Sequence, residues 1–233
     1  MYAYSTISHL GFLLLALSIN SVESIQAFLF YLMQYSVSNL NAFILLISIG
    51  YSFFYMSYKK SYLIEGKNLL KDINNSPLQL VSQLKGYFKI NPMLSISLTI
   101  TLFSFIGVPP LIGFFGKQMV LSAALDNGYV FMALIGIITS VISAVYYLVV
   151  VKNIFFEESD QEVNPNFNNL NSLVYIGNES KKIIVNFNYK SIILSSSLTN
   201  IISILTLIIL LFILIPKEWL NLTSILSSII FYY

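Results

Sequence analysis

Hydrophobic residues gather in five long blocks that carry almost no charge. The blocks cover residues 2–19, 25–56, 92–125, 127–151 and 191–215. Each one approaches or exceeds the roughly 20 residues that an α-helix needs to cross about 30 Å of hydrocarbon. The pattern predicts an all-α membrane protein with about five transmembrane helices, which together make a membrane domain over residues 1–216.

Polar stretches separate the blocks. Residues 57–91 and 152–190 are rich in lysine and asparagine, and we expect loops there, with at most one helical turn in the second. Pro216 ends the last block, because proline lacks the amide donor that a continuing helix needs. We expect residues 217–233 to form an interfacial tail whose aromatic side chains rest at the headgroup level.

The lysines predict an orientation. All twelve basic residues are lysine, and ten of them lie in the two polar loops. Five spans place both loops on the face that holds the N-terminus. Because basic loops stay on the cytoplasmic or matrix side of a membrane, that side should hold the N-terminus, and the C-terminus should lie opposite.

Composition excludes several classes of function. Only 9% of residues are charged, against about 25% in a soluble domain, so lipid is the expected solvent. The net charge of +2 and the scattered lysines argue against nucleic acid. There is no cysteine and one histidine, His9, so we expect no metal site and no cofactor in this chain.

The third block should contain a broken helix. Its 34 residues would make a straight helix of about 50 Å, too long for one crossing. Gly107, Pro109, Pro110 and Gly113 interrupt it, and these residue types remove amide donors and permit unusual backbone angles. We predict a helix break within residues 105–114.

Lys117 follows this break at membrane depth. A charged side chain there costs several kcal/mol and usually faces the bundle interior, where it marks an ion pathway. Lysine suits proton transfer because a buried ammonium gives up its proton readily. The alternative is that Lys117 extends to a membrane surface and the prolines only shape a loop.

Polar positions also recur in the first two blocks. The spacing of Tyr31, Gln34, Ser38 and Asn41 places them on one helical face, which is either hydrogen-bonded glue between helices or the wall of a hydrated channel. His9 is either a neutral hydrogen-bonded residue or a proton relay. Tyr146 and Tyr147 are expected to serve packing and hydrogen bonding.

Four segments carry a family resemblance: AYSTISHLGFLLLAL, FLFYLMQYSVSNLNAF, FSFIGVPPLIGFFGK and GIITSVISAVYYLVVVK. In this order they resemble the antiporter-like membrane subunits of respiratory complex I, most of all the subunit 2 family of mitochondrial NADH:ubiquinone oxidoreductase. The likeness is strong over residues 3–155 and extends by pattern over 191–216. It implies the C-terminal part of the antiporter-like fold, helices ten to fourteen.

The resemblance implies a proton-translocating subunit of NADH:ubiquinone oxidoreductase, with no redox chemistry in this chain. Lys117 and His9 match the family's proton pathway. The alternatives are a component of a cation–proton antiporter and a structural membrane subunit without a proton site.

The resemblance also implies partners and a location. The expected partners are other complex I membrane subunits, including a separate chain that supplies the N-terminal half. We expect that chain to cover polar faces, such as Tyr31–Asn41, that five helices would leave open. The expected location is the mitochondrial inner membrane, with the N-terminus on the matrix side and the C-terminus on the intermembrane side.

Overall fold

The computed structural model describes residues 2–61, 81–158, 171–174, 183–186 and 196–232. Apolar blocks become helices, as their charge-free runs predict. In chain order the elements are α1 (Tyr2–Ile19), α2 (Val22–Ser61), η1 (Val81–Leu84), α3 (Tyr87–Ile90), α4 (Pro92–Ile106), α5 (Ile112–Asp126), α6 (Val130–Phe155), β1 (Asn171–Val174), β2 (Ile183–Asn186), α7 (Ser196–Leu211), η3 (Phe212–Leu214) and α8 (Pro216–Tyr232).

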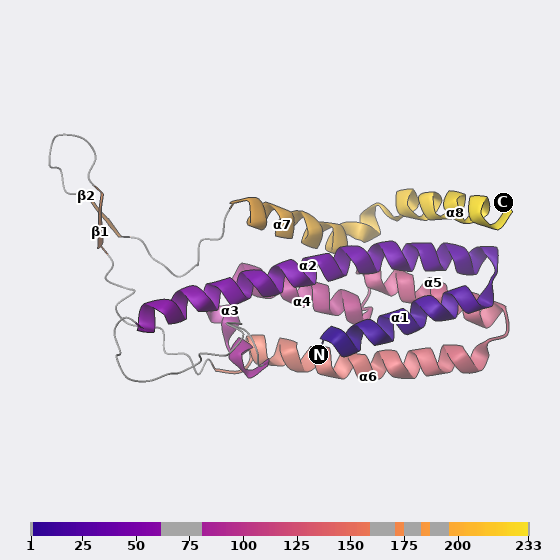
Figure 1. The fold of residues 1–233 in the computed structure, drawn as a ribbon, viewed down its shortest axis with the longest axis horizontal. Coiled ribbons are helices and arrows are strands. Elements are labelled where there is room, and N and C mark those ends of the chain that lie inside the picture. Colours follow the sequence, from indigo (N-terminus) through magenta and orange to yellow (C-terminus); the bar gives the residue numbers. More distant parts are fainter. Residues whose placement is uncertain (1, 62–80, 159–170, 175–182, 187–195, 233) are drawn as a thin grey trace.

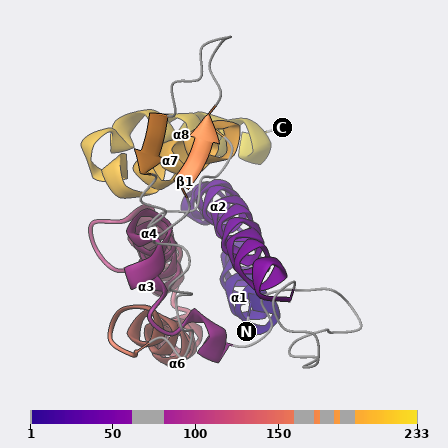
Figure 2. The same ribbon diagram turned by 90° about the vertical axis from the view of Figure 1, so that its left-hand side faces the viewer.

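The long helices form an elongated bundle. Figure 1 shows α1, α2, α6 and the pair α4–α5 running along the same axis. Seen from the end in Figure 2, α7 and α8 cover one side of α2 and α4, while α1 and α6 lie on the opposite side. The C-terminal ends of α2 and α6 and the start of α4 lie at one end of the bundle, which we call the loop-bearing end.

The predicted all-α membrane fold is confirmed. Within the described residues, four helices are long and apolar enough to cross a membrane, at 2–19, 22–50, 130–155 and 197–214. The third predicted span is present as α4 and α5, two helices of 15 residues each. At about 22 Å, each half is shorter than the hydrocarbon layer, so only the pair makes a crossing.

The segment predicted as a loop over 57–91 contains two short helices before α4. Gly86 takes a left-handed conformation, with φ of 65°, and its amide donates to the Asn153 carbonyl at 2.9 Å. Glycine adopts this conformation without steric cost. This contact ties the segment before α4 to the end of α6.

The second predicted loop, 152–190, also has regular structure. The helix α6 extends to Phe155, and β1 and β2 pair as an antiparallel hairpin in which Asn171 lies opposite Asn186. The expectation of a loop with at most a helical turn was therefore wrong for these eight residues. Strands of four residues within a polar stretch leave too few alternating positions to be recognised.

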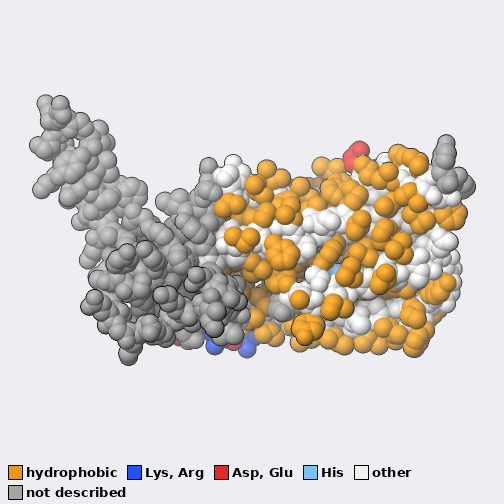
Figure 3. All heavy atoms as spheres, in the orientation of Figure 1, with side chains coloured by type: hydrophobic (Ala, Val, Ile, Leu, Met, Phe, Trp, Pro, Cys, Tyr) orange, Lys and Arg blue, Asp and Glu red, His pale blue; other side chains and the backbone are white. Residues whose placement is uncertain are grey.

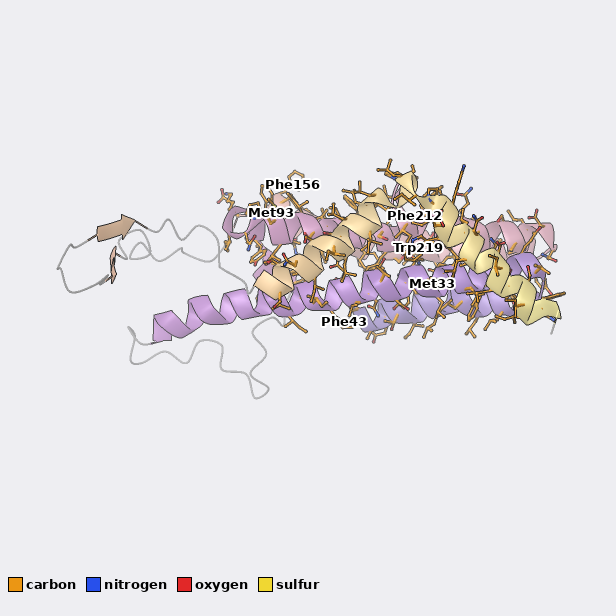
Figure 4. The ribbon with its side chains drawn as sticks, turned by 90° about the horizontal axis from the view of Figure 1, so that it is seen from above. Met33, Phe43, Met93, Phe156, Phe212 and Trp219 are labelled. Carbon is orange, nitrogen blue, oxygen red and sulfur yellow. The ribbon has the colours of Figure 1, made fainter. Side chains whose placement is uncertain are left out.

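The C-terminal residues add a helix to the bundle. The helix α8 packs on α2, where the Gln26 side-chain amide donates to the Leu220 carbonyl at 3.4 Å. At the bend between α7 and α8, Phe212 and Trp219 pack together (Figure 4), with ring centroids 6.1 Å apart. The interfacial position expected for residues 217–233 stays a prediction.

The surface fits a lipid solvent. On the face shown in Figure 3, apolar side chains cover the bundle, and the basic side chains gather at the loop-bearing end. The outer face of α6 exposes Val141, Ile142 and Val145, each by about 60%. A soluble monomer rarely exposes so continuous an apolar surface.

Candidate functional site

The helix break is built on two glycines. Gly107 ends α4 with φ of 90°, and its amide donates to the Phe103 carbonyl at 3.0 Å. Gly113 lies at the start of α5, where a Cβ would stand only 1.9 Å from the carbonyl oxygen of Ser104. Between the two helices, Val108, Pro109 and Pro110 are exposed at the surface of the chain. The break therefore lies at 107–111, within the predicted range.

Lys117 projects from α5 back to the end of α4. Its ammonium donates to the Ile106 carbonyl at 2.8 Å, and the residue is 8% exposed. The last carbonyls of a helix have no partner within the helix and carry partial negative charge, so a cation is favourable there. The side-chain stem packs against Gly107, where a Cβ would stand 3.1 Å from Lys117 Cδ.

No carboxylate balances this lysine within the part of the chain that the structure describes. The two ion pairs found there join Lys85 and Lys152 to Glu157 at the loop-bearing end. Besides the Ile106 carbonyl, the Lys117 ammonium faces the Phe12 ring, 5.6 Å from its centroid. Lys117 is therefore held inside the chain and does not extend to its surface.

The predicted polar stripe on α2 is buried along its length. Tyr31, Gln34, Ser38 and Asn41 are each at most 4% exposed. Gln34 lies beside Gly116 of α5, where a Cβ would stand 3.2 Å from Gln34 Cγ. The expectation that another chain must cover this stripe was wrong, because α4 and α5 of the same chain pack on α2.

Hydrogen bonds connect parts of this stripe to other helices. Ser38 and Ser104 hydroxyls lie 3.4 Å apart, which links α2 to α4 just before the break. His9 of α1 is buried, with Nδ1 2.8 Å from the Tyr31 hydroxyl. These contacts fit the role of glue between helices, and they also place His9 at one end of the stripe.

His9 and Lys117 are connected through Tyr31 and Phe12. The Phe12 ring stacks on Tyr31, with centroids 5.8 Å apart, and Tyr31 is the hydrogen-bond partner of His9. Lys117 faces the same Phe12 ring. Among the described residues no hydrogen bond joins His9 to Lys117, so the structure brings them into one site but not into direct contact.

A polar contact between α1 and α6 involves Ser5, which the sequence pattern did not single out. The hydroxyls of Ser5 and Tyr147 form a hydrogen bond, and the Tyr147 ring stacks on Phe105 at 5.8 Å. Tyr147 thus serves packing and hydrogen bonding, as expected, and its unforeseen partner is Ser5. Ser5 precedes His9 by one helical turn, and this spacing was the available signal.

No metal site is evident in residues 2–61, 81–158 and the other described segments, where no three His, Cys, Asp or Glu side chains come together. The polar groups of the site are an ammonium, an imidazole, hydroxyls and amides. Such groups can bind water and move protons.

Comparisons with known proteins agree with this architecture. A family model described as "NADH:quinone oxidoreductase/Mrp antiporter, TM" matches residues 1–143. The NADH-ubiquinone oxidoreductase chain 2 of Rhizopus oryzae is 43% identical over the whole chain. Subunit N of the NADH-quinone oxidoreductase of Jannaschia sp. is 33% identical over 69% of the chain.

The chain spans only 42% and 29% of the length of these two relatives. It covers similar shares of two solved structures. One is the Mrp complex from Dietzia sp., with a TM-score of 0.68 and 18% identity over 97% of this chain and 41% of that one. The other is respiratory complex I from Thermus thermophilus, with a TM-score of 0.58 and 22% identity over 94% and 38%.

These two structures show a shared fold. The family model covers more than half of the chain, and the broken helix with its buried lysine lies within the matched residues. The chain therefore belongs to the transmembrane family of NADH:quinone oxidoreductases and Mrp antiporters.

Proposed function

We propose that this chain is a proton-translocating membrane subunit of NADH:ubiquinone oxidoreductase, with Lys117 as the group that holds the proton. The observation that carries the proposal is a buried ammonium with no carboxylate partner among the described residues, bonded to the last carbonyl of a broken helix. Buried ionisable groups in membrane bundles mark proton and ion pathways. The names of the relatives supply the reaction.

The geometry around Lys117 suits both of its protonation states. As an ammonium it is favoured by the partial negative charge at the end of α4. As a neutral amine it still has hydrogens to donate to the Ile106 carbonyl, and it gains a lone pair that can accept. Because the contact survives in both states, a proton can arrive and leave without loss of the local structure.

His9 serves in this proposal as a second proton site. Its bond to Tyr31 holds one ring nitrogen, and the other can take up or release a proton. The Phe12 ring, which lies against both Tyr31 and the ammonium, lines the site that the two proton groups share. Iron–sulfur clusters and haem belong to other subunits in this proposal, since this sequence has no cysteine and a single histidine to hold one.

Replacement of Lys117 tests the proposal. Lys117→Ala should leave the complex assembled but reduce the protons pumped per NADH oxidised. Lys117→Arg should also pump poorly, because a guanidinium keeps its charge. Lys152→Ala is the matched control, since that lysine is exposed and paired with Glu157. Pumping equal to wild type in Lys117→Ala would show that the lysine is structural.

A component of a cation–proton antiporter is the second candidate, favoured by the fold shared with the Mrp complex. A purified assembly that oxidises NADH and contains this chain supports the first candidate. An assembly that exchanges cations for protons without NADH oxidation supports the second.

We propose that the partners are other membrane subunits of the complex, and one of them covers the helix break. Val108, Pro109 and Pro110 are exposed about halfway along the bundle (Figure 1). Non-helical backbone at membrane depth is tolerated only where protein or a water-filled cavity surrounds it. A neighbouring helix over residues 108–110 meets this requirement.

We further propose that a separate chain supplies the part of the relatives that this chain does not match, and that it packs beside α1. The relatives are more than twice as long as this chain. Mass spectrometry and density of the purified complex test this idea. One polypeptide carrying both parts, or lipid beside α1, would contradict it.

The proposed location is the mitochondrial inner membrane, with the N-terminus and the loop-bearing end on the matrix side. The 43% identity to the NADH-ubiquinone oxidoreductase chain 2 of Rhizopus oryzae supports the choice of this membrane. The lysines of the two polar loops support the orientation.

A further inference from the structure

Asn41 of α2 is a buried polar residue with no protein partner. The residue is 0% exposed, and neither its side-chain oxygen nor its nitrogen forms a hydrogen bond within the described structure. It is the only buried side chain there with this property. Buried amides in folded proteins are almost always satisfied by protein or by ordered water, so this side chain calls for a partner of some kind.

Helix geometry predicts that Asn41 lies near Thr101. The helices α2 and α4 run in opposite directions (Figure 1) and touch where Ser38 meets Ser104. One turn further along α2 reaches Asn41, and one turn back along α4 reaches Thr101. Both residues are 0% exposed. The Thr101 hydroxyl donates to Leu98, which leaves its oxygen free to accept.

Asn41 also continues a line of polar groups that begins at Lys117. Gln34 of α2 packs against Gly116 of α5, and Gly116 is the residue next to Lys117. The next polar groups along α2 are Ser38, which pairs with Ser104, and Asn41. At a rise of 1.5 Å per residue, Asn41 lies about 10 Å along α2 from Gln34.

Beyond Asn41, towards the loop-bearing end, the buried hydroxyls of Ser48 and Ser95 donate to nearby backbone carbonyls, those of Ile44 and Asn91. Leu45 and Ile49 of α2 and Leu94 and Leu98 of α4 are buried in one hydrophobic cluster. Apolar constrictions of this kind exclude water. The polar line therefore runs from Lys117 to Asn41 and stops there.

We propose that Asn41 binds an internal water molecule, shared with Thr101, and that this water extends the proton path of Lys117 towards the loop-bearing end. A buried water needs two to four hydrogen-bonding partners, and the Asn41 amide and Thr101 oxygen provide three. Such a water accepts a proton on one side and gives one up on the other, with no net change. The relay role rests on the proposed function of Lys117, whereas the binding of water does not.

The first test is high-resolution density for the assembled complex. The proposal expects an ordered water within hydrogen-bonding distance of the Asn41 amide and Thr101 Oγ1. Asn41 packed against apolar atoms, with no water density beside it, would overturn the proposal. This measurement needs no variant, so it holds even if a variant fails to assemble.

The second test compares Asn41→Leu with Ser48→Ala. Leucine has a similar volume and removes no protein hydrogen bond of the described structure, so the complex should assemble as before. Ser48 is buried on the same helix but donates to its own Ile44 carbonyl, so its loss should leave pumping unchanged. Asn41→Leu should lose the water density and lose proton pumping relative to electron transfer.

The outcomes separate this inference from the proposed function. Reduced pumping in Lys117→Ala together with normal pumping in Asn41→Leu would overturn the relay at Asn41 and leave the role of Lys117 standing. Normal pumping in both variants would overturn both. A loss in Ser48→Ala equal to that in Asn41→Leu would show a general packing effect and overturn the relay.

Discussion

At Gly113, α5 lies directly against the backbone of α4. A Cβ at this position would stand 1.9 Å from the Ser104 carbonyl oxygen and 2.8 Å from its carbonyl carbon. Both atoms belong to the backbone, so no side chain can move aside to make room. The position of Lys117, one turn later in α5, depends on this contact.

Gly113→Ala should therefore destabilise the subunit by about 1–3 kcal/mol, the usual cost of overpacking. Gly11→Ala is the matched control, because nothing lies within 4 Å of a Cβ at that helical position. That substitution should stabilise α1 by up to about 1 kcal/mol through helix propensity. Thermal unfolding of the purified complex checks both; similar effects of the two would contradict the close approach.

At the scale of elements, two structural features position the site. The break between α4 and α5 gives Lys117 a helix end to bond. A second feature holds the segment before α4 to α6, where Lys85 Nζ lies 3.1 Å from Glu157 Oε2 and the Gly86 amide donates to Asn153. Since α4 begins at Pro92, this attachment helps to fix where α4 starts.

The ion pair at Glu157 predicts a pH dependence. The hydrogen bond from Lys85, followed by the charges of Lys85 and Lys152, lowers the pKa of Glu157 below its ordinary 4.5. A depressed carboxyl pKa contributes stability that is present above pH 4.5 and is lost as the pH falls through the folded-state value. Glu157→Gln should thus weaken the attachment slightly at neutral pH and have no effect at a pH below that value.

Limited proteolysis between α2 and α4 measures this effect at each pH. Glu158→Gln is the control, because Glu158 is exposed and takes part in neither ion pair of the described residues. High salt should reduce the difference between Glu157→Gln and wild type, since exposed pairs are screened. Equal cleavage of Glu157→Gln and wild type at neutral pH would contradict the attachment.

At the scale of the whole molecule, the helix directions fix which segments share a face. The ends of α2 and α6 lie at the loop-bearing end, whereas the α5–α6 connection lies at the other (Figure 1). Positively charged loops belong on the matrix side. The fold places the ends of α2 and α6, from which the two lysine-rich segments continue, at one end of the bundle, and this arrangement supports the proposed orientation.

Labelling of single introduced cysteines tests this orientation, because this chain has no native cysteine that would also react. Glu158→Cys and Asp126→Cys both change exposed residues. Glu158 follows the C-terminal end of α6, whereas Asp126 ends α5, just before the connection to the start of α6. A membrane-impermeant maleimide added to intact mitoplasts should label Asp126→Cys only. It should reach Glu158→Cys after the membrane is opened. Labelling of Glu158→Cys in intact mitoplasts would reverse the proposed orientation.

The amino-acid sequence alone predicts the membrane class, the helical spans and a break within 105–114, because these follow from runs of apolar residues and from the local chemistry of proline and glycine. It also singled out Lys117, since one charge within a long apolar block is visible without a fold. The stripe from Tyr31 to Asn41 was recognised, but its neighbours were not.

The contacts of each of these residues follow from the tertiary structure. Ser104 and Thr101 carry no signal in sequence, because a hydroxyl in an apolar helix can bond its own backbone. Three further features depend on how α1, α4 and α5 pack on α2. They are the bond of Lys117 to Ile106, the contacts of Phe12 with Lys117 and Tyr31, and the unpartnered amide of Asn41. Periodicity predicts which face of a helix is polar, whereas the partner of that face is set by contacts between distant segments.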